Sequence, residues 1–220
     1  LILFLEECVL TGCVFTGGLW PAREDCGEYL DRAEFFVAAD SGLLLARSFG
    51  LRPDYIVGDM DSLPNLAMLD DYDSCRVIRY PREKDYTDTE LGLELAREKG
   101  CDRIFLVGGG GGRMDHFLAL YSLFHRENPP AAWLTDRDEI IYVNSRFEMR
   151  GWKGREVSLF PLGRGEVRMR SRGLAWPLEG LVWRVGDIGI SNIVTDDYAQ
   201  IELVSGAVLL MRAWGRNGGT

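Results

Sequence analysis

The chain has 220 residues, a length that suits two compact domains of about 100 residues each better than one minimal domain. Hydrophobic residues make up 46% and charged residues 27%, which is typical of folded globular proteins and excludes an intrinsically disordered chain. The formal net charge of -9 argues against a protein that binds nucleic acid by neutralising its phosphates, so any bound anion must be held locally.

The opening segment, residues 1–15, does not have the pattern of a signal peptide. Glu6 and Glu7 stand where such a peptide needs a basic start and an uninterrupted apolar middle. The sequence also contains no run of about 18 apolar residues, the length that a membrane helix needs. We expect a cytoplasmic protein that does not bind membranes. The five cysteines form no CxxC pair, so neither a disulfide framework nor a zinc site is predicted.

Short apolar runs alternate with amphipathic stretches over the first half of the chain. The predicted strands are 8–15, 35–39, 55–57 and 103–107, and the predicted helices are 26–33, 43–50, 87–99 and 115–124. The helix at 87–99 has the clearest signal, because Thr87 and Glu90 have the spacing of a capping box and Gly100 follows its end. Alternating strands and helices predict a Rossmann-like α/β domain with a mainly parallel sheet covered on both faces.

The pattern changes in the second half of the chain. Pro129 and Pro130 end the helical pattern, because neither ring can donate a backbone hydrogen bond. From about Asp138 onward, short runs with strand composition are broken by Gly, Asn and Asp, and they lie at 139–143, 156–160, 166–170, 190–194, 199–204 and 207–211. We therefore predict an α/β domain over 1–135 and an all-β sandwich domain over 136–220.

The first acidic cluster follows the predicted strand 55–57 and contains Gly58, Asp59, Asp61 and Ser62. Two carboxylates separated by one residue can point to the same side of the chain, and their hard oxygens suit Mg²⁺. Without a cation, two like charges about 4 Å apart repel by roughly 4 kcal/mol at an effective dielectric constant of 20. A turn built from Asp, Gly and Ser for backbone reasons is the alternative interpretation.

The second cluster lies at the start of the helix 87–99 and contains Lys84, Asp85, Thr87 and Asp88. A helix N-terminus favours anions, and a neighbouring lysine adds a mobile positive charge, so this position suits a phosphate group. The aspartates could cap the helix, attract a metal ion, or do both. Capping alone explains Thr87, and a solvated loop would explain Lys84 and Asp85.

The third cluster combines the glycine run 108–112 with Arg113, Asp115 and His116. Consecutive glycines after a strand let the backbone approach a phosphate closely, and Arg113 adds a planar set of donors. The run fits neither the Walker pattern nor the dinucleotide fingerprint. His116 could carry a proton or simply form hydrogen bonds at the helix start.

A fourth segment, Asp40, Ser41 and Gly42, follows the predicted strand 35–39 and could be an ordinary helix cap. The four segments share one property, since each lies directly after a predicted strand or before a predicted helix. Ligands of parallel α/β sheets bind at this edge. Their joint placement predicts a metal–nucleotide site with several carboxylates, one lysine and one arginine.

Taken in order, four segments resemble the motifs of the thiamine pyrophosphokinase family, and they span 39–42, 53–62, 81–90 and 112–116. In the second half, 173–178 and 189–192 are similar to the thiamine-binding segments of that family. The resemblance implies an enzyme that transfers the diphosphoryl group of ATP to the hydroxyl of thiamine, giving thiamine diphosphate and AMP. It also implies Mg²⁺ as cofactor and a homodimer with thiamine sites between the subunits.

The resemblance assigns roles to individual residues. The residues expected to act in catalysis are Asp59, Asp61, Lys84, Asp85, Asp88, Arg113 and Asp115, with Asp59, Asp61 and Asp88 as metal ligands. The residues expected to bind the nucleotide are Asp40, Ser41, Gly42, Gly58, Ser62, Thr87, Gly112 and His116. The thiamine pocket is expected to contain Trp176, Ser191 and Asn192. Either Asp85 or Asp115 could accept the proton of the attacking hydroxyl.

Two other classes of protein share part of this pattern. A nucleotide-sugar transferase would also use paired aspartates such as Asp59 and Asp61 to hold a metal–diphosphate, but it gives no reason for the segments 84–88 and 112–116. A non-catalytic sensor of nucleotide or thiamine would keep the pocket without the complete acidic set. Formation of AMP and thiamine diphosphate together distinguishes the diphosphotransferase from both.

Overall fold

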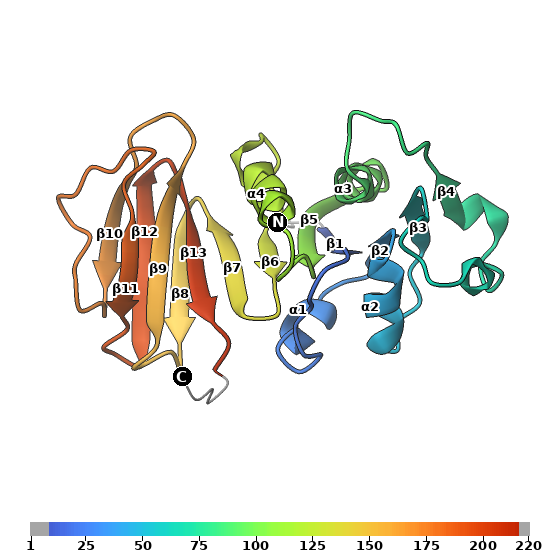
Figure 1. Cartoon of the computed structure of the whole chain (residues 1–220). Helices are drawn as coiled ribbons and strands as arrows, with labels where there is room; N and C mark the ends of the chain where they lie inside the picture. The colour runs from blue at the N-terminus through green and yellow to red at the C-terminus, as the bar shows by residue number, and fades with distance from the viewer. Residues whose placement is uncertain (1–8, 216–220) are drawn as a thin grey trace, which may run out of the picture. The chain divides into compact units, whose positions relative to one another are not determined.

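A computed structural model describes residues 9–215 of the chain, which Figure 1 traces in colour. Residues 1–8 and 216–220 lie outside the described range, so the expectations that rest on Glu6 and Glu7 and on the first residue of the strand 8–15 lie outside it as well. The chain forms two compact units that divide between Gly112 and Arg113.

The first unit is a parallel sheet with helices. Its strands are β1 (Leu10–Phe15), β2 (Phe35–Ala39), β3 (Tyr55–Gly58), β4 (Val77–Arg79) and β5 (Cys101–Val107), in the order β5-β1-β2-β3-β4. Its helical segments are α1 (Gly27–Leu30), α2 (Gly42–Ser48), η1 (Leu66–Leu69), η2 (Ser74–Arg76) and α3 (Asp88–Glu98). The parallel arrangement places the ends of β1, β2, β3 and β5 at one edge of the sheet.

Helices α2 and α3 cover opposite faces of this sheet (Figure 1). Side chains alternate along each strand, so neighbouring residues of β2 point to opposite faces. Gly92 of α3 packs on the face of the sheet that carries Val37, whereas Leu43 of α2 belongs to a buried cluster with Ala38. The prediction of a sheet covered on both faces is therefore confirmed.

The second unit is a β sandwich with one helix. Its strands are β6 (Ala132–Leu134), β7 (Asp138–Val143), β8 (Arg146–Arg150), β9 (Glu156–Leu162), β10 (Arg168–Arg172), β11 (Gly189–Ile193), β12 (Tyr198–Ser205) and β13 (Ala207–Ala213). They pair antiparallel in the orders β11-β9-β13-β7-β6 and β10-β12-β8. Both sets of strands contribute to one buried core, for example through Leu159, Leu210, Met149 and Ile201. The predicted fold class, an α/β unit followed by a β sandwich, is confirmed.

Helix α4 (Met114–Ser122), followed by η3 (Leu123–His125), is part of the second unit. The Phe117 ring packs against Trp133 of β6 at a tilt of 43°, with centroids 4.9 Å apart, and Phe124 stacks on the same indole with centroids 6.4 Å apart. The sequence-based boundary at 135/136 would place α4 and β6 with the α/β domain. These aromatic contacts join α4 to β6 within the second unit, and the boundary at 135/136 stays a prediction.

Local differences from the predicted elements have identifiable causes. Helix α1 covers only part of 26–33, because Arg32 and Ala33 donate to Tyr29 and Leu30, which is turn geometry with three-residue spacing. Strands β4, β6 and β8 were not predicted. Two of them have only three residues, and β8 is mostly exposed, so none has a clear hydrophobic pattern.

Among residues 9–215, none of the helices combines the length and the apolar composition needed to cross a lipid bilayer.

The start of α3 has the predicted capping box. Thr87 Oγ1 accepts a hydrogen bond from the backbone N–H of Glu90 at 3.2 Å, and the Glu90 carboxylate accepts one from the N–H of Thr87 at 2.7 Å. Each bond satisfies an N–H that a helix start would otherwise leave unpaired. The direction and first residue of α3 are thus fixed by local chemistry.

We expect Thr87→Ala to lower the free energy of unfolding by about 1 kcal/mol, because it removes the side-chain acceptor of the cap. Urea denaturation of the variant against the parent chain measures this loss. Glu94→Ala is the matched control on the same helix, since the Glu94 side chain is 65% exposed and forms an ion pair with Arg97 at 3.6 Å. An equal loss in the two variants would contradict a specific role of the cap.

Candidate active site

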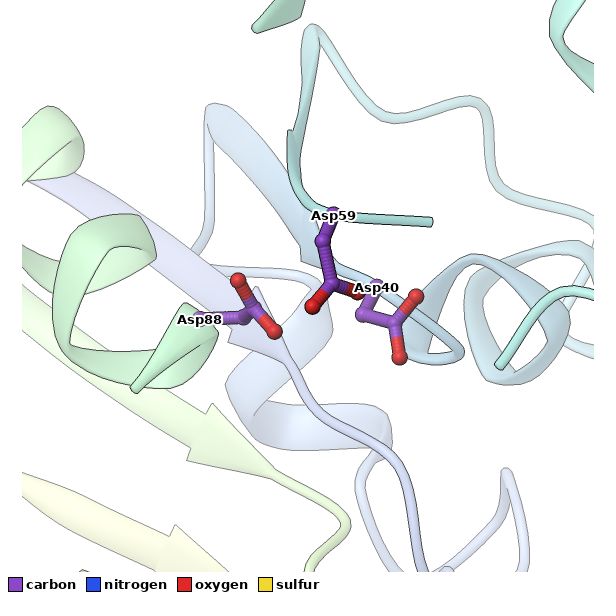
Figure 2. A group of neighbouring side chains, drawn as sticks. All are labelled: Asp40, Asp59 and Asp88. Carbon is purple, nitrogen blue, oxygen red and sulfur yellow. The ribbon is translucent and has the colours of Figure 1, made fainter. Parts of the chain in front are cut away.

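Three carboxylates from different elements meet at the edge of the parallel sheet where β2 and β3 end. Asp40 follows β2, Asp59 follows β3, and Asp88 is the first residue of α3. One oxygen of each lies within 4.8 Å of the others. Figure 2 shows the three side chains as neighbours. The sequence predicted this edge as the site, and the structure brings Asp59 and Asp88 together there with Asp40.

The backbone next to these carboxylates adopts left-handed conformations. Asp40 has φ 48°, Gly58 has φ 137° and Met60 has φ 65°. A Cβ on Gly58 would lie 3.0 Å from Cγ of Asp88 and 3.3 Å from Cβ of Asp40. Glycine at position 58 therefore satisfies both the turn and the close approach of two carboxylates. The strained φ of Asp40 is a cost that the surrounding fold must offset.

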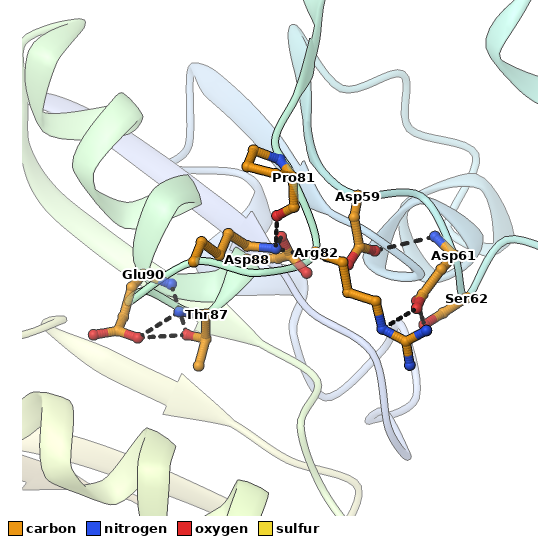
Figure 3. Close-up of polar contacts among 9 residues, drawn as sticks. Asp59, Asp61, Ser62, Pro81, Arg82, Thr87, Asp88 and Glu90 are labelled. Atoms are coloured by element: carbon orange, nitrogen blue, oxygen red, sulfur yellow. Dashed lines mark hydrogen bonds and ion pairs between the residues drawn. The ribbon is translucent and has the colours of Figure 1, made fainter.

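Lys84 supplies the positive charge of the group. Figure 3 shows Pro81, Asp59 and Asp88, the residues whose oxygens it contacts. Its Nζ lies 3.1 Å from Asp88 Oδ1 and 3.7 Å from Asp59 Oδ2, and it donates a hydrogen bond to the carbonyl of Pro81 at 3.1 Å. The side chains of Lys84, Asp59 and Asp88 are only 13%, 15% and 23% exposed. The ion pairs are thus partly shielded from solvent.

The carboxylates of Asp59 and Asp88 have pKa values shifted in opposite directions. The backbone N–H of Asp61, 3.1 Å from Asp59 Oδ1, lowers the pKa of Asp59, and the Lys84 ammonium adds to this effect. Burial raises the pKa of Asp88, although the contact with Lys84 opposes the rise. The two groups therefore differ in how readily they give up a proton.

Asp40 carries a buried oxygen that is unsatisfied within the described residues. The residue is 9% exposed, and Oδ1 has no hydrogen-bond partner anywhere in 9–215. A buried unsatisfied acceptor costs about 1–3 kcal/mol, and more if it is charged, so such a group calls for an explanation. Three aspartates and one lysine leave the group with a formal charge of -2 at neutral pH, from -3 plus 1. This set of hard oxygens fits a divalent metal ion.

Asp61 and Ser62, predicted as a metal ligand and a nucleotide contact, lie outside this carboxylate group. Asp61 Oδ1 accepts a hydrogen bond from the Ser62 hydroxyl at 3.1 Å, and Asp61 Oδ2 lies 3.6 Å from Arg82 Nε. The backbone N–H of Asp61 is what contacts Asp59. In this conformation the residue orients another carboxylate, and its own carboxylate is turned toward Arg82.

Thr87, Asp85, Ser41 and Gly42 also lie in the first unit. The Thr87 hydroxyl is engaged in the α3 cap, and Asp85 is exposed in the preceding loop. Ser41 precedes α2, and Gly42 is its first residue. A Cβ on Gly42 would collide with the backbone carbonyl of Phe15, so this glycine allows α2 to approach the end of β1.

The glycine run is tied down by backbone hydrogen bonds. The N–H of Gly109 donates to the carbonyl of Gly17 at 2.7 Å, and Leu19 and Gly110 exchange bonds of 2.6 and 2.9 Å. Gly112 has φ 70°. The run was predicted to cradle a phosphate, but the amides of Gly109 and Gly110 already have partners in this structure.

Arg113, Asp115 and His116 begin the second unit and are close together. The Arg113 guanidinium donates to both oxygens of Asp115 at 3.1 and 2.5 Å, and the backbone N–H of His116 donates to Asp115 at 3.0 Å. The hydrogen bonds from Arg113 are the main reason why the pKa of Asp115 is lowered to about 2. The ion pair between Arg113 and Asp115 is thus a structural reason for their spacing of two residues, and it needs no ligand.

The predicted thiamine contacts also lie near one another in the second unit. Asn192 Oδ1 accepts from the N–H of Trp176 at 3.1 Å, and Asn192 Nδ2 donates to the carbonyl of Trp176 at 2.8 Å. Asn192 is buried, whereas Trp176 is 59% exposed. Ser191 has φ 57° and its N–H donates to Ser158. Asn192 therefore holds the backbone of Trp176 in place and leaves the indole exposed.

Sequence reasoning missed two features of the site. Asp40 was expected to contact the nucleotide, and the structure places it with the carboxylates of Asp59 and Asp88. The available signal was its position directly after a strand, which it shares with Asp59. The second feature is a buried hydrogen bond of 2.7 Å between the hydroxyls of Thr16 and Thr89. It joins the end of β1 to the first turn of α3, and no local pattern could reveal it.

Comparison with known proteins gives consistent matches over both units. A family model described as thiamin pyrophosphokinase, catalytic domain, matches residues 26–132, and one described as thiamin pyrophosphokinase, vitamin B1 binding domain, matches residues 139–208. The thiamine pyrophosphokinase of Bacillus subtilis (strain 168) is 25% identical over 91% of this chain and 97% of that protein.

Solved structures share the fold. The crystal structure of thiamine pyrophosphokinase from Bacillus subtilis superposes with a TM-score of 0.77 at 23% identity, covering 92% of this chain and 98% of that one. A thiamin pyrophosphokinase family protein from Enterococcus faecalis has a TM-score of 0.76 at 21% identity, covering 94% of this chain and all of that one.

We expect Gly58→Ala to push Asp88 out of the carboxylate group and to lower the free energy of unfolding by about 1–3 kcal/mol, because the new Cβ is too close and φ is unfavourable. Binding of Mn²⁺, followed by electron paramagnetic resonance, and urea denaturation measure the two effects. Gly27→Ala is the control, since Gly27 begins α1 with no atom near its ideal Cβ. Unchanged Mn²⁺ binding in Gly58→Ala would contradict the packing argument.

Proposed function

This chain belongs to the thiamin pyrophosphokinase family, and we propose that Asp40, Asp59 and Asp88 hold the divalent metal ion with which it transfers the diphosphoryl group of ATP to thiamine. The observation that carries this proposal is the group of three carboxylates at the sheet edge, with one buried oxygen of Asp40 unsatisfied. Mg²⁺ is the ion that we propose, because hard oxygen ligands suit it.

In the proposed reaction, the hydroxyl oxygen of thiamine forms a bond to the β-phosphorus of ATP. The bond between that phosphorus and the oxygen shared with the α-phosphate breaks, and AMP leaves with this oxygen. When bound, the divalent ion would neutralise charge on the phosphate oxygens. Catalysis of such transfers depends mostly on positioning and on neutralising charge.

Lys84 and Arg113 are the residues that we propose to offset polyphosphate charge. Lys84 lies beside the N-terminus of α3, where the helix dipole also favours anions. Ser41, Gly42, Gly58, Ser62, Thr87, Gly112 and His116 remain proposed nucleotide contacts or supports. Among them, Gly58 and Thr87 have a positioning role that follows from their contacts with the carboxylate group and the helix cap.

Of the two candidates for proton acceptor, we favour Asp85. Asp115 is bound by Arg113, and a carboxylate with a pKa of about 2 is a weak base at neutral pH. Asp85 is exposed in the loop before α3, two residues from the proposed phosphate position at Thr87. The proton released by the thiamine hydroxyl would pass to its carboxylate.

Thiamine would bind against Trp176, with Ser191 and Asn192 shaping the site. The exposed indole offers a flat face that attracts a cationic aromatic ring, and thiamine carries a positively charged thiazolium. The buried amide of Asn192 fixes the backbone that presents this indole. We propose that Asn192 acts by positioning Trp176.

Other parts of the proposal rest on the sequence together with these observations. A homodimer is supported by exposed apolar residues on the β-sandwich unit, namely Trp176, Leu181, Val185, Ile188 and Ile190. We keep the functional division at 135/136, which falls in the gap between the two matched family models. A cytoplasmic location remains a proposal. Family membership favours the diphosphotransferase over a nucleotide-sugar transferase or a non-catalytic sensor.

We expect Asp40→Asn, Asp59→Asn and Asp88→Asn each to lower kcat/KM by on the order of 100-fold or more and to weaken Mn²⁺ binding, because each removes a charged ligand. The assay incubates the protein with Mg-ATP and thiamine and measures AMP and thiamine diphosphate together. AMP without thiamine diphosphate would keep the transferase class and reject thiamine as the acceptor.

Asp61→Asn tests the remaining predicted ligand separately. We expect it also to lower turnover by on the order of 100-fold, but to keep Mn²⁺ binding in the absence of nucleotide, since the Asp61 carboxylate lies outside the group. Near-normal activity in Asp59→Asn would overturn the metal assignment, whereas near-normal activity in Asp61→Asn would overturn only the part of Asp61 in turnover. Circular dichroism confirms that each variant keeps its fold.

We expect Asn192→Ala to raise the KM for thiamine by about tenfold or more, because a displaced indole no longer meets the acceptor, and to leave the KM for ATP nearly unchanged. Steady-state kinetics with each substrate varied in turn measures the split. Val204→Ala is the matched control on the same unit, because Val204 is 55% exposed. An equal rise in both KM values would indicate general loss of structure.

A further inference from the structure

We propose that Lys84 takes the place of the divalent ion in the metal-free protein, so that the Lys84 ammonium must leave the carboxylates before the ion can bind. This inference rests on the metal site proposed above and adds a defined movement of one side chain. Lys84 is then a positioning residue. Its ammonium contacts the carboxylates before the ion binds, and it contacts phosphate after the ion has bound.

The contacts of Lys84 have the arrangement expected of an internal counter-ion. Its Nζ contacts Asp88 at 3.1 Å and Asp59 at 3.7 Å, and the Pro81 carbonyl accepts its third contact at 3.1 Å. The contact with the Pro81 carbonyl is a hydrogen bond, whereas the contacts with Asp88 and Asp59 are ion pairs that attract the ammonium by charge. With 13% of its side chain exposed, Lys84 is largely withdrawn from solvent and so is unavailable to an incoming phosphate in this state.

Two cations cannot share this position. A divalent ion bound by Asp59 and Asp88 would lie close to the present Nζ, and like charges about 4 Å apart repel strongly in a partly buried site. The lysine stem is long and flexible, so the ammonium can withdraw without moving the backbone. Asp40 Oδ1 and Asp88 Oδ1 are both buried without a hydrogen-bond partner among residues 9–215, so both are available to the ion.

Binding of the ion and of the polyphosphate should therefore support each other. The ion alone must displace the Lys84 ammonium from Asp59 and Asp88 and leave it without a carboxylate partner. When a triphosphate is present, the released ammonium gains phosphate oxygens as new acceptors. The site would thus bind the metal–nucleotide complex better than either component.

Lysine labelling tests the movement directly. The chain has three lysines, Lys84, Lys99 and Lys153, and the latter two are exposed and serve as internal references. Brief acetylation of the native full-length protein, followed by peptide mass spectrometry, should modify Lys84 slowly without metal. Addition of Mn²⁺ alone should raise its rate about fivefold or more relative to the references, and addition of ATP with the ion should lower it again. A Lys84 rate that Mn²⁺ leaves unchanged would overturn the proposal.

Metal affinity gives a second, independent measurement. Lys84→Met makes the formal charge of the group more negative, from -2 to -3, so we expect it to bind Mn²⁺ alone about tenfold more tightly than the parent chain. Lys99→Met is the matched control, because it makes the same change in net charge directly after the other end of α3. Lys84→Arg keeps the charge and should bind Mn²⁺ within about threefold of the parent. Equal or weaker binding by folded Lys84→Met contradicts the exchange.

The outcomes separate this inference from the proposed function. If the parent chain binds Mn²⁺ and makes thiamine diphosphate while Lys84→Met shows no gain in affinity, only the exchange fails. If the parent chain binds no Mn²⁺ with or without ATP, the metal site and the exchange fail together. Thermal melting of each variant shows whether a loss of affinity reflects loss of fold.

Discussion

The mutual repulsion of three carboxylates is the constraint on which the first unit depends at its functional edge. Asp40, Asp59 and Asp88 are held within 4.8 Å of one another although they carry the same charge. The fold achieves this by fixing their backbones: parallel strands end side by side, a glycine at position 58 removes the Cβ that would separate two of them, and a capped helix presents the third. Lys84 offsets part of the charge, and the rest makes the site a strong attractor for cations.

The elements that sequence predicted best are those with local signals. β2 has the predicted bounds, and α3 begins with the predicted capping box, because side chains and backbone within one turn decide where a helix starts. β4, β6 and β8 could not be predicted from local pattern, since short strands exist through their pairing with distant segments. The edge of the sheet that carries the site followed from topology alone.

The position of the site could be predicted from the sequence, but the contacts among its side chains could not. Asp59 and Asp88 were expected to meet, and they do, yet the part played by Asp40 depends on the path of the backbone after β2. Similarly, nothing local shows that Asn192 uses both ends of its amide on the backbone of Trp176. Sequence motifs identify which residues matter, whereas the contacts decide which of them touch a ligand and which hold another residue in place.

The glycine run has a consequence for how this chain tolerates genetic change. Gly108, Gly109, Gly111 and Gly112 all have positive φ, and a Cβ on Gly108 would collide with the carbonyl of Thr16. A glycine-rich composition suggests a loose linker, but this segment is held in place by backbone hydrogen bonds. Almost any missense change at these neighbouring codons introduces backbone strain, so the segment concentrates mutational fragility in a very short stretch of the gene.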